Sequence, residues 1–124
     1  MCNVFKDQFK FMTACDQSVT GFNEKQYNLY RSLIAEEVNE LNEAVEQNDR
    51  VEQLDALIDI LVVTVGAIHS MGADGEGAWN EVMRTNFAKI DSHTGKVRKR
   101  EDGKVLKPAD WRPPELAPYI KETA

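Results

Sequence analysis

Acidic side chains on the apolar faces of two successive helical segments constrain this chain more than any other feature. In the first segment, residues 24–47, apolar side chains form one stripe when they are drawn at about 100° per residue. Glu37 falls at the centre of that stripe and Glu40 falls inside it, whereas Glu36 lies on its edge. These positions need a partner, because an unpaired charge on a face that packs against a core is costly.

In the second segment, residues 50–71, the contrast between acidic side chains and an apolar surface is stronger. Between residues 54 and 68 it is apolar nearly all round, which is typical of a buried helix. Three carboxylates nevertheless share one of its faces: Glu52, Asp55 and Asp59.

The two segments are joined by a short break at residues 48 and 49, so we expect them to pack as an antiparallel pair. At 1.5 Å per residue, Glu40 lies roughly 10 Å from that break and Asp55 roughly 8 Å, which makes the acidic faces level. Converging carboxylates either take up protons or bind a cation, and ligands that are all oxygen suit Mg²⁺ or Mn²⁺ rather than zinc. The alternative is that these acids stay solvated at the edge of a bundle.

Helical periodicity and capping residues predict an all-α fold. Asn3, Asn23 and Asp49 are suited to cap helix starts, and Gly72 is suited to end a helix. We expect a single domain, residues 1–124, because this length is close to that of one ordinary domain. The expected architecture is a four-helix bundle with an extended tail, and its helices span residues 4–15, 24–47, 50–71 and 75–91.

The tail, residues 92–124, differs from the rest of the chain in charge. It carries eight Lys or Arg against five Asp or Glu, while residues 1–91 carry sixteen acids against seven bases. Asp102-Gly103 lies between two short runs and favours a hairpin with a type I′ turn, before a further extended segment. Such a basic tail either folds over an anionic ligand or is simply solvated.

Composition argues against several classes of function. A net charge of −6 makes the chain a poor general binder of nucleic acid, whose phosphates repel it. The longest apolar run, residues 60–68, is far shorter than the roughly 20 residues that a membrane span needs. Two cysteines and no leader-like N-terminal segment favour a cytoplasmic protein. There is no Glu-x-x-His pair for a di-iron site, and no Walker or EF-hand loop.

Several motifs together resemble the all-α nucleoside triphosphate pyrophosphohydrolases, the superfamily of the MazG-like enzymes. The paired acidic helices of that superfamily are similar to Glu36-Glu37-x-x-Glu40 followed by Glu52-x-x-Asp55. Three further motifs resemble the phage and bacterial phosphoribosyl-ATP-pyrophosphohydrolase-like branch of the superfamily. They are Asn86-Phe-Ala-Lys89, Asp102-Gly-Lys-Val-Leu-Lys107-Pro and Trp111-Arg-Pro-Pro114. The resemblance covers the second to fourth helices and the tail, and it is weak before Phe22.

The resemblance implies hydrolysis of a (deoxy)nucleoside triphosphate to the monophosphate and pyrophosphate, with dUTP, dCTP and dGTP all open as substrates. Two or three Mg²⁺ ions, or Mn²⁺ in their place, would be held by four carboxylates: Glu37, Glu40, Glu52 and Asp55. Asp59 would be an additional ligand or would support one. Glu36 would orient or deprotonate the attacking water.

The resemblance also implies contacts to the substrate from outside the acidic helices. Asn86 would contact the sugar and Lys89 a phosphate, while the tail would close over phosphate through Lys104, Lys107 and Arg112. A base pocket is the weakest of these expectations, and it would be formed by Phe9, Met12, Asp16 and Gln17. For each of these residues taken singly, a purely structural role or simple exposure to solvent is an alternative to contact with the substrate.

Self-association is a further implication, because members of the superfamily form homodimers or dimers of dimers with shared sites. Two alternative functions stay open at this point. One is hydrolysis of phosphoribosyl-ATP itself, and the other is a non-catalytic helical protein that binds nucleotide or metal. Neither nucleic acid nor a membrane is an expected partner, and for a phage-encoded chain the location would be the host cytoplasm.

Overall fold

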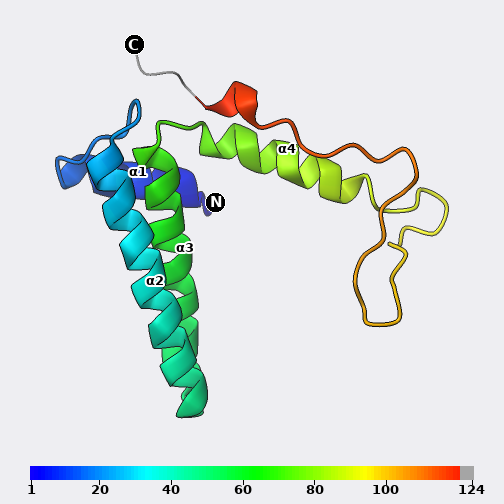
Figure 1. Ribbon diagram of the computed structural model, residues 1–124, viewed down its shortest axis with the longest axis horizontal. Coiled ribbons are helices and arrows are strands. Elements are labelled where there is room, and N and C mark those ends of the chain that lie inside the picture. Colours follow the sequence, from blue (N-terminus) through cyan, green and yellow to red (C-terminus); the bar gives the residue numbers. More distant parts are fainter. Residues whose placement is uncertain (121–124) are drawn as a thin grey trace. The chain divides into compact units, whose positions relative to one another are not determined.

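The computed structural model describes residues 1–120, and within them the chain is helical. The helices are α1 (Val4–Ala14), α2 (Glu24–Glu46), α3 (Arg50–Ser70), α4 (Gly75–Phe87) and a short 3-10 helix, η1 (Ala117–Tyr119) (Figure 1). The described residues contain isolated β-bridges but no regular strand. The all-α prediction is therefore confirmed, and the first three helices begin where the sequence places them. The last four residues of the expected tail lie outside the described part.

Two compact units make up the chain, and each is described by itself. The first contains residues Met1–Gly75 together with Ile120, and the second contains residues Glu76–Tyr119. The single domain expected over residues 1–124 stays a prediction.

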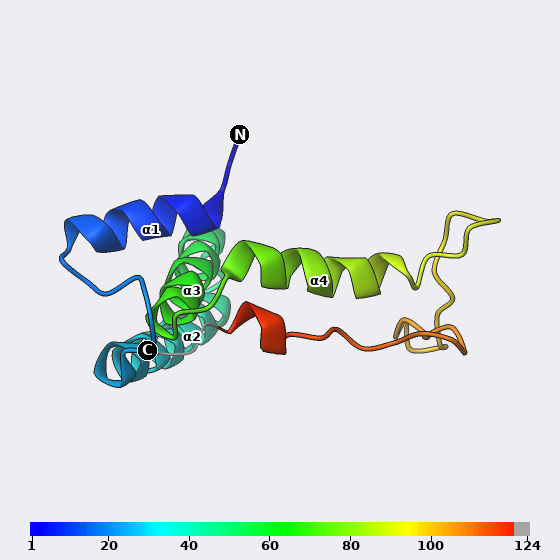
Figure 2. The same ribbon diagram turned by 90° about the horizontal axis from the view of Figure 1, so that it is seen from above.

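α2 and α3 form the antiparallel pair that the short break predicts. At one end the Asn23 backbone N–H donates to the Ser70 carbonyl over 2.8 Å. At the other end the Gln53 amide reaches the Ala44 carbonyl over 3.4 Å. Figures 1 and 2 both show the two helices side by side along their length.

Side chains that the sequence marks as caps do cap the helices. Asn3, Asn23 and Asp49 each accept a hydrogen bond from the backbone N–H three residues later, which satisfies a donor that the helix leaves free. Gly72 ends α3 in a left-handed conformation, with φ of 74°. Its N–H donates to the His69 carbonyl, and the next N–H donates to the Ile68 carbonyl, as in a Schellman motif.

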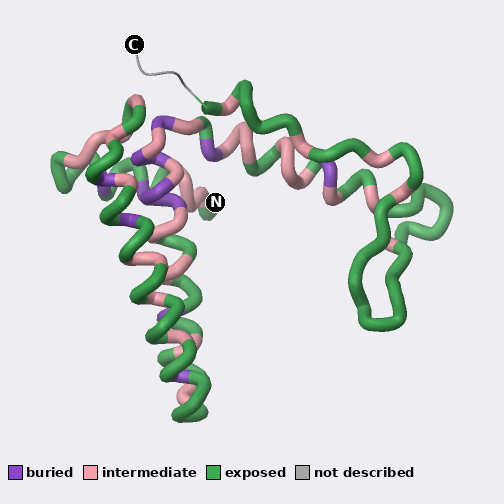
Figure 3. The backbone as a smooth tube through the Cα atoms, viewed as in Figure 1, coloured by how far each residue is buried: buried purple, intermediate pink, exposed green. Residues whose placement is uncertain are grey.

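The core lies where α1 crosses the pair, near the end of α3. Met12 is fully buried there, against Tyr30 of α2 and Ala67 of α3. Figure 3 shows the buried backbone gathered at this end. The Tyr30 ring lies so close to Gly66 that a Cβ on that glycine would be 2.3 Å from the ring carbon Cε1. The Tyr30 hydroxyl donates to the Gln17 side chain over 2.6 Å, which fixes the ring in place.

Gly66→Ala is expected to destabilise the protein although alanine favours helices. The gain in helix propensity is about 1 kcal/mol, whereas forcing a methyl into a packed core costs typically 1–3 kcal/mol. Thermal unfolding should show a melting temperature several degrees lower. In the double variant with Tyr30→Leu the added methyl should cost much less, because the shorter side chain leaves it room. Equal costs in both backgrounds would contradict this packing argument.

α3 departs from the sequence prediction of a helix buried all round. In the single chain its last two turns and Ala56 are buried, but much of its first half is exposed. Four apolar side chains at spacings of three and four residues are 77%, 61%, 52% and 41% exposed, and we call them the apolar stripe: Val51, Leu54, Ile58 and Leu61. The reason is that α1, which among the described residues is the other helix of this unit, is short and covers the opposite end.

α4 ends four residues earlier than the 75–91 prediction. After Phe87 the chain turns, with backbone hydrogen bonds from Lys89 to Asn86 and from Ile90 to Phe87. These span three residues instead of four, so the helical repeat is not continued.

The tail hairpin was predicted with the wrong turn. The chain does double back, and a single bridge pairs Lys99 with Val105, but no regular strand forms around it. The Gly103 N–H donates to the Arg100 carbonyl over 2.9 Å and Gly103 has φ of 89°, while Asp102 has no positive φ. A type I′ turn needs two residues with positive φ, so this is a three-residue loop closed by a left-handed glycine.

Candidate active site

Carboxylates from the facing sides of α2 and α3 interact with one another. The groups brought together are Glu37 and Glu40 of α2 with Asp55 and Asp59 of α3. Each lies on the face where helical periodicity places it. The electrostatic coupling therefore agrees with the level acidic faces that the sequence predicts.

Glu37 is the most perturbed member of this group. Its residue is half-buried, and the oxygen Oε2 is buried without a hydrogen-bond partner among the described residues. Burial raises the pKa of Glu37 to about 6, with further contributions from a hydrogen bond to Glu40 and from the charges of Glu40, Asp59 and Asp55. A buried oxygen without a donor is rare in proteins, and it is suited to accept a proton or a cation.

Asp59 shows the same effect from the other helix. Burial raises the pKa of Asp59, and the charges of Asp55 and Glu40 raise it further. Two acids on different helices therefore resist ionisation for the same reason, which is that like charges converge on a partly desolvated space.

Glu36 and Glu52 stand apart from this cluster. Both residues are exposed, and neither contributes to the raised pKa of Glu37 or Asp59. Glu52 lies in the first turn of α3, where its backbone N–H is bound by the Asp49 side chain over 3.1 Å. The structure thus brings four of the six predicted carboxylates together.

The donor chemistry of the cluster fits a hard divalent cation. Carboxylate oxygens are the ligands that Mg²⁺ and Mn²⁺ prefer, and the unpartnered Oε2 of Glu37 offers one of them. In the part of the chain that the structure describes, no three Asp, Glu, His or Cys side chains are already placed to hold a metal ion together.

Basic residues of the second unit gather around one indole ring. Trp111 donates from Nε1 to the carbonyl of the buried Thr85 over 2.7 Å, which ties the tail to α4. The ammonium groups of Lys89 and Lys107 lie 5.2 Å and 4.6 Å from the centre of its ring. Lys89 also donates to the Asn86 side chain over 3.0 Å. Lys89 and Lys107 are therefore neighbours through Trp111, and Asn86 joins them through Lys89.

The other two predicted tail residues, Lys104 and Arg112, are exposed, and neither places its charged group over the Trp111 ring. The sequence analysis assigns Trp111 to an extended segment and to a family-like motif, without a role for its ring. The sequence does contain one signal for this grouping of lysines, which is the bulky aromatic side chain between Lys107 and Arg112. Lysines pack readily over such rings.

The four residues predicted for a base pocket have different environments. Met12 is fully buried in the core, and Phe9 is partly exposed with its ring edge-on to His69. Gln17 accepts the Tyr30 hydroxyl, and Asp16 is exposed with a positive φ of 58°. Met12, Phe9 and Gln17 thus contribute to packing around α1 and its following loop.

A family model described as phosphoribosyl-ATP pyrophosphohydrolase matches residues 7–86, more than half of the chain. The chain therefore belongs to this family, within the MazG-like all-α superfamily, and as a class it is a nucleotide pyrophosphohydrolase. No match was found among curated proteins.

The matched range contains all six predicted carboxylates and Asn86, and it ends before Lys89 and the tail. A separate finding is that none of the helices of the described residues is both long enough and apolar enough to cross a membrane.

Proposed function

We propose that this protein hydrolyses a (deoxy)nucleoside triphosphate to the monophosphate and pyrophosphate and so adjusts a nucleotide pool. The observation that carries the proposal is the convergence of Glu37, Glu40, Asp55 and Asp59 in a chain of this family. Such a cluster is unfavourable alone, and the divalent cations that accompany a triphosphate would neutralise both the carboxylates and the phosphates.

The proposed ligands of two or three Mg²⁺ ions are Glu37, Glu40, Glu52 and Asp55, with Asp59 as a further ligand or a support for one. Bound Mg²⁺ neutralises phosphate charge and makes the phosphorus more electrophilic. The raised pKa of Glu37 and Asp59 supports this choice, because both groups would ionise more readily beside a cation.

Glu36 is the proposed base. Its exposed carboxylate lies one residue before Glu37, at the edge of the acidic face, where it can accept a proton from a water molecule. The water oxygen forms a bond to the α-phosphorus. The bond from the α-phosphorus to the oxygen that bridges it to the β-phosphate breaks, and pyrophosphate leaves.

Substrate contacts are proposed for the residues that the sequence singles out in the second unit. Asn86 contacts the sugar, while Lys89, Lys104, Lys107 and Arg112 contact phosphate. The bond between Lys89 and Asn86 supports a joint role for that pair. For the base, Phe9, Met12, Asp16 and Gln17 stay a prediction.

Lys89→Met is expected to raise the KM for the nucleotide about tenfold and to change kcat less, because a charged hydrogen bond to phosphate contributes to binding. Lys96→Met removes the same charge from the same unit but not from Trp111, and it is the matched control. Steady-state kinetics at fixed ionic strength measures both. An equal increase in KM in the two variants would indicate general electrostatic attraction of the nucleotide rather than a direct contact with Lys89.

The second candidate function is hydrolysis of phosphoribosyl-ATP, which the description of the matching family favours. Incubation of the protein and Mg²⁺ with each common (deoxy)nucleoside triphosphate and with phosphoribosyl-ATP separates the two. Pyrophosphate released from the former supports the proposal, and release from phosphoribosyl-ATP alone supports the second candidate. If metal raises the melting temperature and no compound is consumed, the protein is a non-catalytic binder.

A second copy of this chain is the proposed partner, as a homodimer or a dimer of dimers. The apolar stripe on α3 supports this, because four adjacent exposed side chains at helical spacing form a face that a packed helix would cover. A cytoplasmic location fits an enzyme that acts on a nucleotide pool.

A further inference from the structure

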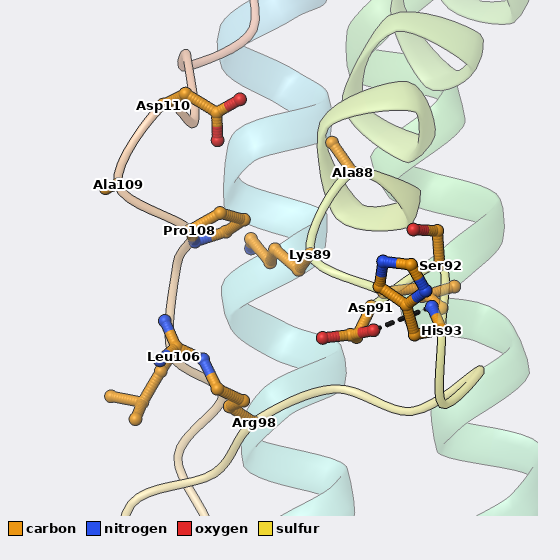
Figure 4. Close-up of a pocket in the computed structure, with 11 residues that line it drawn as sticks. Ala88, Lys89, Asp91, Ser92, His93, Arg98, Leu106, Pro108, Ala109 and Asp110 are labelled. Carbon is orange, nitrogen blue, oxygen red and sulfur yellow. Dashed lines mark hydrogen bonds between the residues drawn. The ribbon is translucent and has the colours of Figure 1, made fainter.

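The tail lines an open cavity that the proposed reaction does not use as a whole. It has a volume of 370 Å³, and every residue that lines it lies between Ala88 and Asp110, within one compact unit (Figure 4). These residues come after the range that matches the family, which ends at residue 86. The cavity therefore belongs to a part of the chain that the family match leaves unassigned.

Three nitrogen-bearing side chains line this cavity: Lys89, His93 and Arg98. Lys89 uses one N–H of its ammonium on Asn86 and keeps two for another acceptor. The structure shows no hydrogen bond from the Arg98 guanidinium to any described residue. In Figure 4, Lys89 and Arg98 come from different segments, and Lys89 extends toward Pro108 while Arg98 extends toward Leu106.

Two acids also line the cavity, equal in number to its Lys and Arg residues, and one of these acids already has partners. Asp91 accepts the backbone N–H groups of His93 and Thr94 through Oδ1, over 2.7 Å and 3.2 Å, and so shapes the loop. The other acid is Asp110. Over residues 88–112 the chain carries eight Lys or Arg against four Asp or Glu, so the segment around the cavity has a net positive charge that attracts anions to it.

We propose that this cavity is a binding site for a phosphomonoester, with Arg98 as its principal contact and Lys89 and His93 beside it. Arg98 offers a planar fork of N–H donors, which matches two oxygens of a phosphate group. Apolar side chains, among them Leu106 and Pro108, complete the wall and leave a surface for the organic part of the ligand. The volume is in the range of small-molecule sites and exceeds that of a bare phosphate ion.

The test uses the full chain in the presence of EDTA, so that the carboxylate cluster holds no metal. Adenosine monophosphate, inorganic phosphate and adenosine are titrated separately, and backbone amide shifts are followed by NMR. The first two probes are expected to move amides within residues 88–98 and 106–110, and adenosine is expected to leave them unchanged. If the cavity amides do not respond, or respond equally to adenosine, the proposal is wrong.

Arg98→Ala should weaken binding of adenosine monophosphate at least tenfold. Lys99→Ala removes an equal charge from the next residue, which does not line the cavity, and it should change the affinity less than twofold. Equal losses in the two variants would overturn the proposal, because they would indicate attraction by net charge alone.

This inference goes beyond the proposed hydrolysis and can fail separately from it. Binding to the cavity is measured without metal or turnover, so it should be unchanged in Glu37→Gln. The KM of Arg98→Ala in the hydrolysis assay then identifies the source of the phosphate. A raised KM means that the group belongs to the substrate, and an unchanged KM with lost binding means a separate ligand.

Discussion

Glu37→Gln is expected to lower pyrophosphate release on the order of 10³-fold, which corresponds to about 4 kcal/mol of transition-state stabilisation. The variant keeps the size of the side chain but loses the charge that is proposed to hold Mg²⁺. Mg²⁺ should raise the melting temperature of the natural protein and change that of the variant much less. Product release and thermal unfolding, each measured with and without Mg²⁺, test the two statements.

The same change should stabilise the metal-free protein above neutral pH. The pKa of Glu37 is raised from 4.5 to about 6 by burial first and then by Glu40, so the folded state binds this proton more tightly than the unfolded state. The free energy of unfolding therefore falls as pH rises through this range, and the full loss is present above pH 6. Because Glu37 is only half-buried, we expect at most about 1 kcal/mol and a melting temperature a few degrees higher in the variant at pH 8.

Glu43→Gln is the matched control, because Glu43 lies on the same helix with its side chain exposed. It should keep full activity and the same pH dependence of stability as the natural protein. A Glu37→Gln variant that hydrolyses nucleotide as fast as this control would exclude Glu37 from the metal site. A lower stability at pH 8 would instead contradict the assignment of a strained, partly buried charge.

Local rules predicted the helices well because the local signals agree with one another. Asn3, Asn23 and Asp49 combine capping chemistry with the start of an apolar repeat, and the structure uses all three as caps. The acidic faces could also be predicted from local sequence, because a charged carboxylate such as Glu37 stands out among the apolar side chains of its stripe. The placement of Asp55 and Asp59 opposite it then followed from the short break between helices.

Features that depend on tertiary contacts could not be predicted from the sequence. The end of α4 at Phe87 and the loop at Gly103 depend on how the tail packs, and no local signal distinguishes the observed turn from type I′. The grouping of Lys89 and Lys107 depends on Trp111, whose anchor, the Thr85 carbonyl, is 26 residues away along the chain. Contacts of this range leave no periodic pattern.

The exposure of α3 is the most informative difference, because composition predicts a buried helix and the single chain covers only part of it. Burial of an apolar side chain such as Leu54 or Ile58 removes from water an area worth about 25 cal/mol per Å². Residues at such heptad-like spacing form a face that a second helix can cover. The proposed second copy would complete the burial that the sequence predicts.

Ile58→Arg is accordingly expected to weaken self-association at least a hundredfold, because it places a charge at the centre of the apolar stripe. In the single chain Ile58 is 52% exposed, so the substitution should leave the helical content of one chain unchanged. Sedimentation equilibrium gives the association constant, and circular dichroism gives the helical content. Phe11→Arg alters a side chain of similar exposure, 61%, on α1 and outside the stripe, and it should associate as the natural protein does. A natural protein that sediments as a monomer at high concentration would show that no second copy covers α3.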